Sequence, residues 1–199
     1  QAVAFASKIH NISCTIIMPK NASPSKIVAT KSYGAKVILE GNSYDESANY
    51  VKDFARKENK TIIPAFEDPE IILGQGTVGL EIMEDLEKVD EVYVPIGGGG
   101  LIAGISIAIK SINHRVKIIG VEFAAFPTMK KSIFENKIIN AREGYTIADG
   151  ISIKTPGKLT LEIVKKYVDS IVLIDDNAIV KTMFLLMERS KIVSEPAGA

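Results

Sequence analysis

The sequence predicts an α/β fold in which mainly parallel sheets are covered by helices. Short runs of β-branched and other apolar residues alternate with longer stretches of helical periodicity along the chain. The predicted strands are apolar throughout, which is typical of parallel strands buried on both faces. One of them runs directly into four consecutive glycines and then into a helix. The 199 residues, 46% hydrophobic and 24% charged, are sufficient for a large core.

The N-terminal third alternates strands with helices. Its predicted strands are residues 14–18, 36–39 and 61–63. The first helix follows Ser23-Pro24 and ends at Gly34, a residue type that commonly follows the end of a helix. Ser43 and Glu46 form a capping-box pattern, which predicts the start of the second helix.

The same alternation continues in the rest of the chain. We expect helices over residues 76–86, 101–112, 128–136, 161–168 and 175–189, and strands over residues 91–95, 117–122 and 170–174. The segment 64–76 holds two prolines and three acids, which indicates a crossing between two lobes. We therefore expect residues 1–67 to form part of a small α/β lobe and residues 68–199 part of a large, phosphate-binding one.

Both ends of the sequence resemble interrupted elements. Gln1 opens directly on helical sequence, and the chain stops at Ala199 as another helix begins. We therefore expect a chain cut at both ends, with two incomplete three-layer lobes. Apolar surface left open at the cut ends would favour self-association, so we expect a homo-oligomer.

Composition and charge exclude several classes of protein. Lys and Arg number 24 and Asp and Glu also 24, so the overall basic charge of a nucleic-acid-binding protein is missing. No apolar run reaches the ~18 residues of a membrane span, and the start has no signal-peptide pattern. Cys14 is the only cysteine, so no internal disulfide can form. We expect a cytoplasmic protein that binds neither nucleic acid nor a membrane.

The glycine run is the strongest functional signal in the sequence. Gly97, Gly98, Gly99 and Gly100 join a buried strand to an apolar helix that starts at Leu101. Successive glycines expose backbone N–H groups, and the first turn of the helix adds unpaired N–H groups and the positive end of its dipole. This arrangement predicts a site for a phosphate dianion. The alternative is a tight turn with no ligand.

The pattern alone leaves the kind of phosphate ligand open. A P-loop is excluded because no Lys-Ser or Lys-Thr follows the glycines. A loose dinucleotide pattern remains, with Gly98, Gly100 and Ala103 in the loop and Glu122 at the end of the next strand, about where a ribose-binding acid would stand. A dinucleotide-binding module therefore stays an alternative at this point.

The loop and its helix resemble the phosphate loop of the threonine dehydratase and serine racemase branch of fold-type-II pyridoxal-phosphate enzymes. The resemblance covers nearly the whole chain and includes six further segments in the family's order. These are residues 1–4, 33–37, 72–81, 119–122, 146–150 and 195–199. It implies two α/β lobes of the tryptophan synthase β type and pyridoxal 5′-phosphate as cofactor.

The resemblance also implies which residues bind the cofactor. The phosphate would lie on the four glycines and the backbone of Leu101, with Gly150 close to the pyridine ring and Glu195 near the cofactor. From the residues alone, Gly150 is equally a turn before a helix, and Glu195 is an acid at the start of one, stabilised by the dipole.

The family's reacting groups have no counterpart in this sequence. The family's Schiff-base lysine precedes a Ser-x-Gly-Asn-His motif and would therefore lie before Gln1. The residue facing the pyridine nitrogen would follow Ala199. We therefore expect no catalytic residue in this chain and no activity from it alone. Some members bind a cation through the acid matching Glu122 and an acid six residues on, but Thr128 stands there, so no metal site is expected.

For the parent protein the resemblance implies a lyase of amino-acid metabolism. It would eliminate the hydroxyl of L-threonine or L-serine and release a 2-oxo acid and ammonia, as in isoleucine biosynthesis. Serine racemase, from the same branch, is the nearest alternative. The alternatives from other classes are a dinucleotide-binding module and a structural piece without a ligand.

Overall fold

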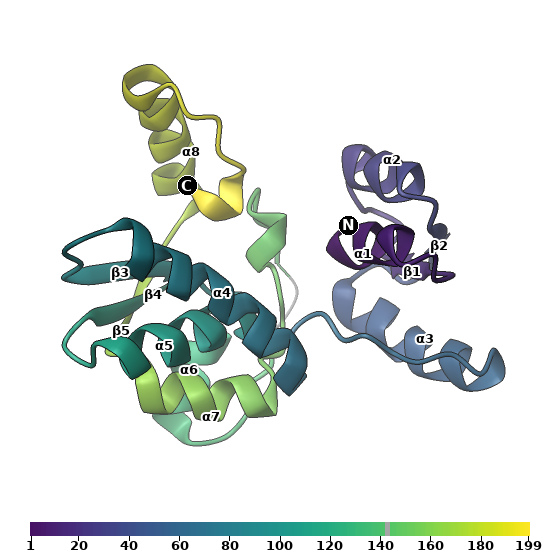
Figure 1. Ribbon diagram of the computed structural model, residues 1–199, viewed down its shortest axis with the longest axis horizontal. Coiled ribbons are helices and arrows are strands. Elements are labelled where there is room, and N and C mark those ends of the chain that lie inside the picture. Colours follow the sequence, from purple (N-terminus) through teal and green to yellow (C-terminus); the bar gives the residue numbers. More distant parts are fainter. Residues whose placement is uncertain (142–143) are drawn as a thin grey trace. The chain divides into compact units, whose positions relative to one another are not determined.

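The computed structural model describes residues 1–141 and 144–199, and these form two compact units (Figure 1). The units are Gln1–Ile63 and Pro64–Ala199. The predicted lobe boundary falls after Glu67, whereas Phe66 and Glu67 pack inside the second unit against residues 98–100 and 157–159. The extent of the two lobes in a longer protein stays a prediction.

The first unit is a two-stranded parallel sheet with three helices. Its elements are α1 (Ala2–Ile9), β1 (Thr15–Met18), α2 (Pro24–Ser32), β2 (Lys36–Leu39) and α3 (Tyr44–Lys57). Strands β1 and β2 pair in parallel from Thr15 with Lys36 onwards. Ser43 caps α3 as predicted, since the Glu46 N–H donates to Ser43 Oγ at 3.3 Å, but the Glu46 carboxylate accepts the N–H of Asn42 at 2.8 Å instead of the Ser43 N–H of a standard capping box.

The predicted strand at residues 61–63 is wrong. These residues follow α3 without pairing to any strand in the described chain, and the side chains of Ile62 and Ile63 are 40% and 53% exposed. Three β-branched residues favour extended backbone, but a strand also needs a hydrogen-bonded neighbour. Neither β1 nor β2 supplies one.

The second unit contains a three-stranded parallel sheet in the order β3-β4-β5. Its elements are α4 (Pro69–Asp85), β3 (Glu91–Pro95), α5 (Gly100–Ile112), β4 (Lys117–Phe123), α6 (Thr128–Glu135), the 3₁₀ turn Asp149–Ile151, α7 (Lys158–Tyr167), β5 (Ser170–Ile174) and α8 (Asp176–Leu185). Helical segments connect β3 to β4 and β4 to β5, and each pair of neighbouring strands is parallel. The predicted parallel α/β class is therefore confirmed.

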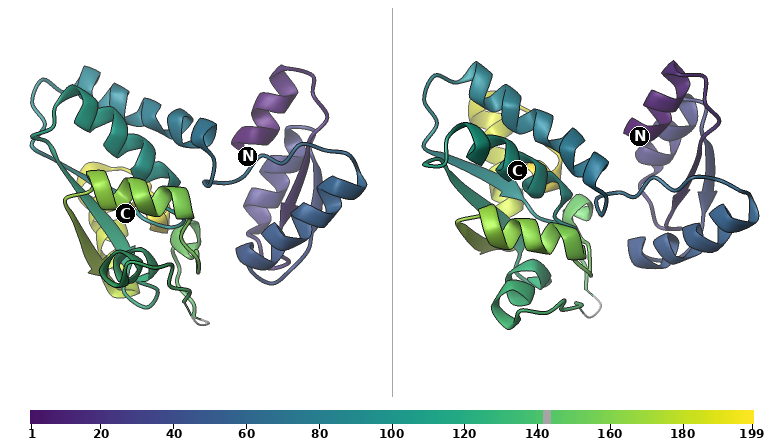
Figure 2. Two further views of the ribbon diagram at one scale, coloured as in Figure 1. Left: turned by 90° about the horizontal axis from the view of Figure 1, so that it is seen from below. Right: turned by 60° about the horizontal axis from the view of Figure 1, so that its bottom comes forward.

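The core of the second unit lies between the sheet and the helices α5 and α7. It is built from Val94, Ile96, Ile102, Ile105, Ile109, Val116, Ile118, Met129, Leu161 and Val164. Helix α4 lies beside α5, and α5 beside α7 (Figure 2). The opposite side of β3 is less covered, since Tyr93 is 59% exposed. The burial of both faces expected for these strands is thus incomplete at β3.

Helix α4 starts earlier than the sequence predicted, at Pro69, and it packs closely against α5. Asp68 caps it, accepting the N–H groups of Glu70 and Ile71 at 2.8 and 3.2 Å. Glycines within a segment normally argue against helix, but here they permit close helix packing. A Cβ added to Gly104 in α5 would lie 2.3 Å from the carbonyl oxygen of Ile72 in α4. The backbones of α4 and α5 therefore meet directly.

Helix α8 is shorter than predicted. Asp175 caps it through the Ala178 N–H at 2.9 Å, as expected, but the regular helix ends at Leu185 and continues as one wider π-type turn, Leu186–Ser190. Within the described chain, no helix has the length and apolar character needed to cross a membrane.

Candidate functional site

The glycine loop lies at the carboxyl end of β3, where α5 begins. Gly99 is in the left-handed region, with φ of 94°, which glycine adopts at little cost. The backbone N–H groups of residues 97–101 donate to no protein acceptor among the residues that the structure describes. A row of unpaired amide donors at a helix N-terminus is a ready site for an anion.

Protein atoms occupy the space where side chains of the loop would lie. A Cβ on Gly98 would be 2.4 Å from the ring of Phe66, and one on Gly100 would be 2.7 Å from the Phe66 Cβ. A Cβ on Gly99 would be 2.6 Å from Met129 and 2.9 Å from Thr160. Packing therefore requires glycine at these positions whether or not a ligand is present, which the sequence pattern alone did not reveal.

The carbonyl side of the loop is fixed by the segment that leads into α7. Gly98 O accepts the Thr160 hydroxyl at 2.7 Å and the Gly157 N–H at 3.3 Å. The Leu159 N–H in turn donates to the Glu67 carboxylate at 2.7 Å. The loop is thus held by hydrogen bonds from one side and by Phe66 on the Cβ side.

The structure brings the predicted cofactor residues together. A Cβ on Gly97 would lie 3.2 Å from the carbonyl oxygen of Gly150, so the loop and the 3₁₀ turn touch. A Cβ on Gly150 would lie 3.0 Å from Ala197 Cβ and 3.6 Å from Glu195 Oε1. Glu195 precedes the last short 3₁₀ turn but makes no capping hydrogen bond with its side chain. Leu101 follows in the first turn of α5.

The turn that carries Gly150 is anchored to the start of α8. Asp176 Oδ1 accepts the Thr146 hydroxyl at 2.6 Å and the Ile147 N–H at 3.2 Å. The Ala148 N–H then donates to the Thr146 hydroxyl at 3.1 Å. A second apolar cluster supports this turn from below, formed by Phe123, Phe126, Ala148, Ile151 and Ile179. These contacts set the distance between Gly150 and the loop.

Glu122 has a structural task that accounts for its place after β4. Its carboxylate is 1% exposed and accepts the N–H groups of Met129 at 2.7 Å and Lys130 at 3.0 Å, at the start of α6. Burial raises the pKa of Glu122, against the lowering effect of these N–H donors. With both oxygens bound to α6, the carboxylate is not presented to a ribose at the loop. The dinucleotide alternative therefore loses its acidic residue.

The surroundings of the loop offer no metal site in the described chain and include packing residues that the sequence did not reveal. The described residues contain no group of three or more His, Cys, Asp or Glu side chains that could hold an ion. Sequence reasoning missed Phe66, Glu67 and Thr160, which shape the loop from outside it. The sequence signal for Thr160 was weak. Pro156-Gly157 before a helix predicts a turn, but it does not predict that this turn packs against the glycine loop.

The parallel α/β architecture, with a strand-to-helix glycine loop whose amides have no partner among the described residues, is typical of proteins that bind a phosphate group. The family model described as pyridoxal-phosphate dependent enzyme matches residues 1–199. The chain belongs to this family. The family expected from the sequence is thereby confirmed.

Named relatives narrow the likeness to one branch. An L-threonine ammonia-lyase of Thermotoga maritima is 47% identical over 199 residues, which are 100% of this chain and 50% of that protein. The L-threonine dehydratase catabolic TdcB of Escherichia coli (strain K12) is 45% identical over the same 199 residues, 60% of its length. The chain thus spans about half to three fifths of these relatives.

Solved structures give the same picture. The structure of maize serine racemase superimposes with a TM-score of 0.93 and 36% identity, covering 100% of this chain and 60% of that one. The processed form of threonine deaminase isoform 2 from Solanum lycopersicum superimposes with a TM-score of 0.92 and 33% identity, covering 100% of this chain and 55% of that one. The fold is therefore that of part of a fold-type-II enzyme.

The loop fits the phosphate group of pyridoxal phosphate. Its amide donors have no partner in the described part of the chain, its four glycines carry no side chain, and the N-terminus of α5 contributes a favourable dipole. The turn at Gly150 lies next to the loop at Gly97, and the carboxylate of Glu195 lies next to Gly150.

Proposed function

We propose that the whole protein is a pyridoxal-phosphate-dependent ammonia-lyase acting on L-threonine or L-serine. The reaction removes the hydroxyl and the amino group and yields a 2-oxo acid and ammonia. The observation that carries this proposal is the 47% and 45% identity to threonine ammonia-lyases across all 199 residues, glycine loop included.

In this proposal, the backbone of the loop holds the cofactor phosphate. The N–H groups of Gly97, Gly98, Gly99, Gly100 and Leu101 donate to its oxygens, and the dipole of α5 favours its negative charge. Such charge-assisted bonds contribute roughly 1.5–3 kcal/mol each before entropy losses. The loop therefore fixes the position of the cofactor and takes no part in bond breaking.

The other two residues face the remainder of the cofactor. Gly150 presents backbone to the ring, and the Glu195 carboxylate accepts hydrogen bonds from polar groups of the site. When bound, pyridoxal phosphate supplies an electron-accepting ring that stabilises negative charge at the substrate Cα. No residue of the chain is assigned as the acid or base of the reaction.

We also propose that the 199-residue chain alone has no lyase activity. By the resemblance, the lysine that captures the cofactor has no counterpart in it, and covalent capture requires that amine. Treating the chain with pyridoxal phosphate and borohydride should label no single lysine stoichiometrically, and threonine should give no 2-oxobutyrate. Labelling at one lysine together with turnover would contradict this.

Serine racemase remains the second candidate, favoured by the similarity to the maize enzyme. An assay of the full-length protein for 2-oxobutyrate from L-threonine and for D-serine from L-serine distinguishes the ammonia-lyase from the racemase. We expect 2-oxobutyrate as the main product. D-serine without 2-oxobutyrate would favour the racemase.

The metabolic role proposed for the full-length protein is broad. Amino-acid metabolism follows from the relatives, but several of the similar proteins are described as catabolic, so isoleucine biosynthesis is not specifically supported. A cytoplasmic location and a homo-oligomeric state stay predictions.

A further inference from the structure

The peptide between Gly98 and Gly99 is held in one orientation from the side of its carbonyl group. Gly98 O accepts the Thr160 hydroxyl at 2.7 Å, and the Gly157 N–H reaches the same oxygen at the longer distance of 3.3 Å. A trans peptide is planar, so its C=O and N–H point in opposite directions. Fixing the Gly98 carbonyl therefore also fixes the direction of the Gly99 N–H, which has no acceptor among the described residues.

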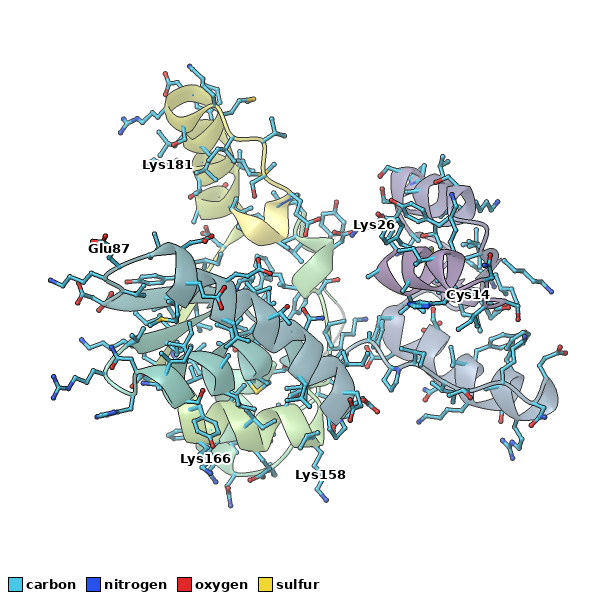
Figure 3. The ribbon with its side chains drawn as sticks, in the orientation of Figure 1. Cys14, Lys26, Glu87, Lys158, Lys166 and Lys181 are labelled. Atoms are coloured by element: carbon cyan, nitrogen blue, oxygen red, sulfur yellow. The ribbon has the colours of Figure 1, made fainter. Side chains whose placement is uncertain are left out.

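The Thr160 side chain is built into the unit at this point. It is fully buried, with 0% exposure, and its hydroxyl also lies 3.2 Å from the carbonyl oxygen of Gly157. It lies in the first turn of α7, near Lys158, whose side chain extends outward in Figure 3. The Leu159 N–H is bound by Glu67 at 2.7 Å, which holds this end of α7 in place. The hydroxyl therefore approaches the loop from a fixed support.

Without this hydrogen bond the loop peptide has an alternative orientation. Gly98 and Gly99 carry no side chains, and glycine backbone rotates at little cost. A rotated Gly98–Gly99 peptide would turn the Gly99 N–H away from its present direction. Of the two hydrogen bonds that hold the Gly98 carbonyl, the one from the buried Thr160 hydroxyl is the shorter, at 2.7 Å against 3.3 Å from the Gly157 N–H.

We propose that Thr160 is a positioning residue for the cofactor phosphate, because its hydroxyl orients the Gly99 N–H toward that phosphate. This inference rests on the proposed binding of pyridoxal phosphate at the loop, but not on which amino acid is the substrate. Thr160 does not touch the cofactor. It acts through the peptide to which it donates.

The test compares three variants of the full-length protein. Thr160→Val keeps the shape of the side chain and removes the hydroxyl, whereas Thr160→Ser keeps the hydroxyl. Thr30→Val is the matched control, since Thr30 is also 0% exposed and its hydroxyl donates to a backbone carbonyl at 2.7 Å, but in the first unit. Each is titrated with pyridoxal phosphate, and the phosphorus-31 resonance of the bound phosphate is recorded.

The valine variant should bind pyridoxal phosphate about tenfold more weakly, which corresponds to ~1.4 kcal/mol, and shift the phosphorus-31 resonance. Thr160→Ser should bind within about threefold of the wild type with the resonance unchanged, and Thr30→Val should match the wild type. Thermal unfolding of the cofactor-free proteins separates binding from folding.

Three results would overturn the proposal. These are wild-type affinity in a folded Thr160→Val variant, a loss in Thr160→Ser as large as in the valine variant, and an equal loss in Thr30→Val. If the valine variant does not fold, the serine variant still decides, since a tenfold loss in it contradicts the role of the hydroxyl. A wild-type protein that binds the cofactor but releases no 2-oxobutyrate would contradict the proposed reaction and leave this inference intact.

Discussion

Substituting Gly98 by alanine tests how the glycine loop is packed. The added Cβ would lie 2.4 Å from the Phe66 ring, whereas ordinary contacts begin near 3.4 Å, so ring or loop has to move by about 1 Å (3.4 − 2.4). Overpacking of this kind costs roughly 1–3 kcal/mol. The strain comes from a protein neighbour, so the cofactor-free protein should be destabilised.

A double-mutant cycle with Phe66→Leu isolates this contact. Leucine removes the ring edge that meets the new Cβ, so Gly98→Ala should cost about 1 kcal/mol less in the Phe66→Leu background than in the wild type. The assay is urea unfolding of the cofactor-free full-length protein, with the midpoint and slope compared among the four proteins. Additive costs would show that Phe66 does not fill the space beside Gly98, and the packing explanation would fail.

Further predictions concern packing and charge away from the loop. Gly104→Ala should cost roughly 3 kcal/mol or more, because its Cβ meets backbone at 2.3 Å, whereas Gly74→Ala, with nothing within 4 Å, should stabilise the helix by ~0.5–1 kcal/mol; thermal unfolding measures both. Asp169→Asn should lower stability by about 1 kcal/mol at pH 7 in urea unfolding, because the neutral amide loses the ion pair with Lys110 and accepts the Ile118 N–H without the help of a charge. Because the pKa of Asp169 is lowered in the folded protein, this difference should disappear as pH falls through that pKa. The pKa of Glu122 is raised in the folded protein, so its contribution to stability is full below the ordinary carboxyl pKa and declines as pH rises through the raised pKa. Glu122→Gln should therefore flatten the pH dependence of the free energy of unfolding between these two pKa values. An unchanged pH profile would contradict this prediction.

The pKa shift of Asp169 has opposing causes. Burial alone would raise the pKa, but the Lys110 side chain at 2.8 Å and the Ile118 N–H at 2.7 Å stabilise the carboxylate and hold the pKa below its ordinary value. Asp169 thereby joins α5 to β4 just before β5. Asp169 therefore stabilises the folded protein only while it is ionised, that is, above its lowered pKa.

Periodicity predicted the elements that local sequence controls. The strands β3 and β5 have the expected bounds, and α3 begins after the expected cap, Ser43. These elements combine a clear apolar run or cap with an unambiguous end, so local propensity and tertiary packing agree. The parallel class followed because fully apolar strands alternate with helices.

Elements decided by contacts distant in sequence were not predictable. Helix α4 was expected to begin at residue 76 but begins at Pro69, and its Gly76 and Gly79 lie against the backbone of α5. Residues 61–63 have strand propensity but no strand to pair with. Propensity describes one segment at a time, whereas both outcomes depend on a second segment.

The candidate site divides in the same way. The glycines of the loop were identifiable because their pattern and their place between strand and helix are local. Phe66 and Thr160 were not, because they reach the loop from segments 32 and 62 residues away from Gly98 (98 − 66 and 160 − 98). The family resemblance grouped Gly97, Gly150 and Glu195 around one cofactor, and the folded chain places Gly150 next to both Gly97 and Glu195.

A crystal structure of the full-length protein with pyridoxal phosphate tests the central claim most directly. We predict phosphate oxygens within hydrogen-bond distance, ~2.7–3.2 Å, of the backbone nitrogens of residues 97–101, with Gly150 beside the ring. A phosphate bound elsewhere, with these N–H groups facing solvent, would contradict the account.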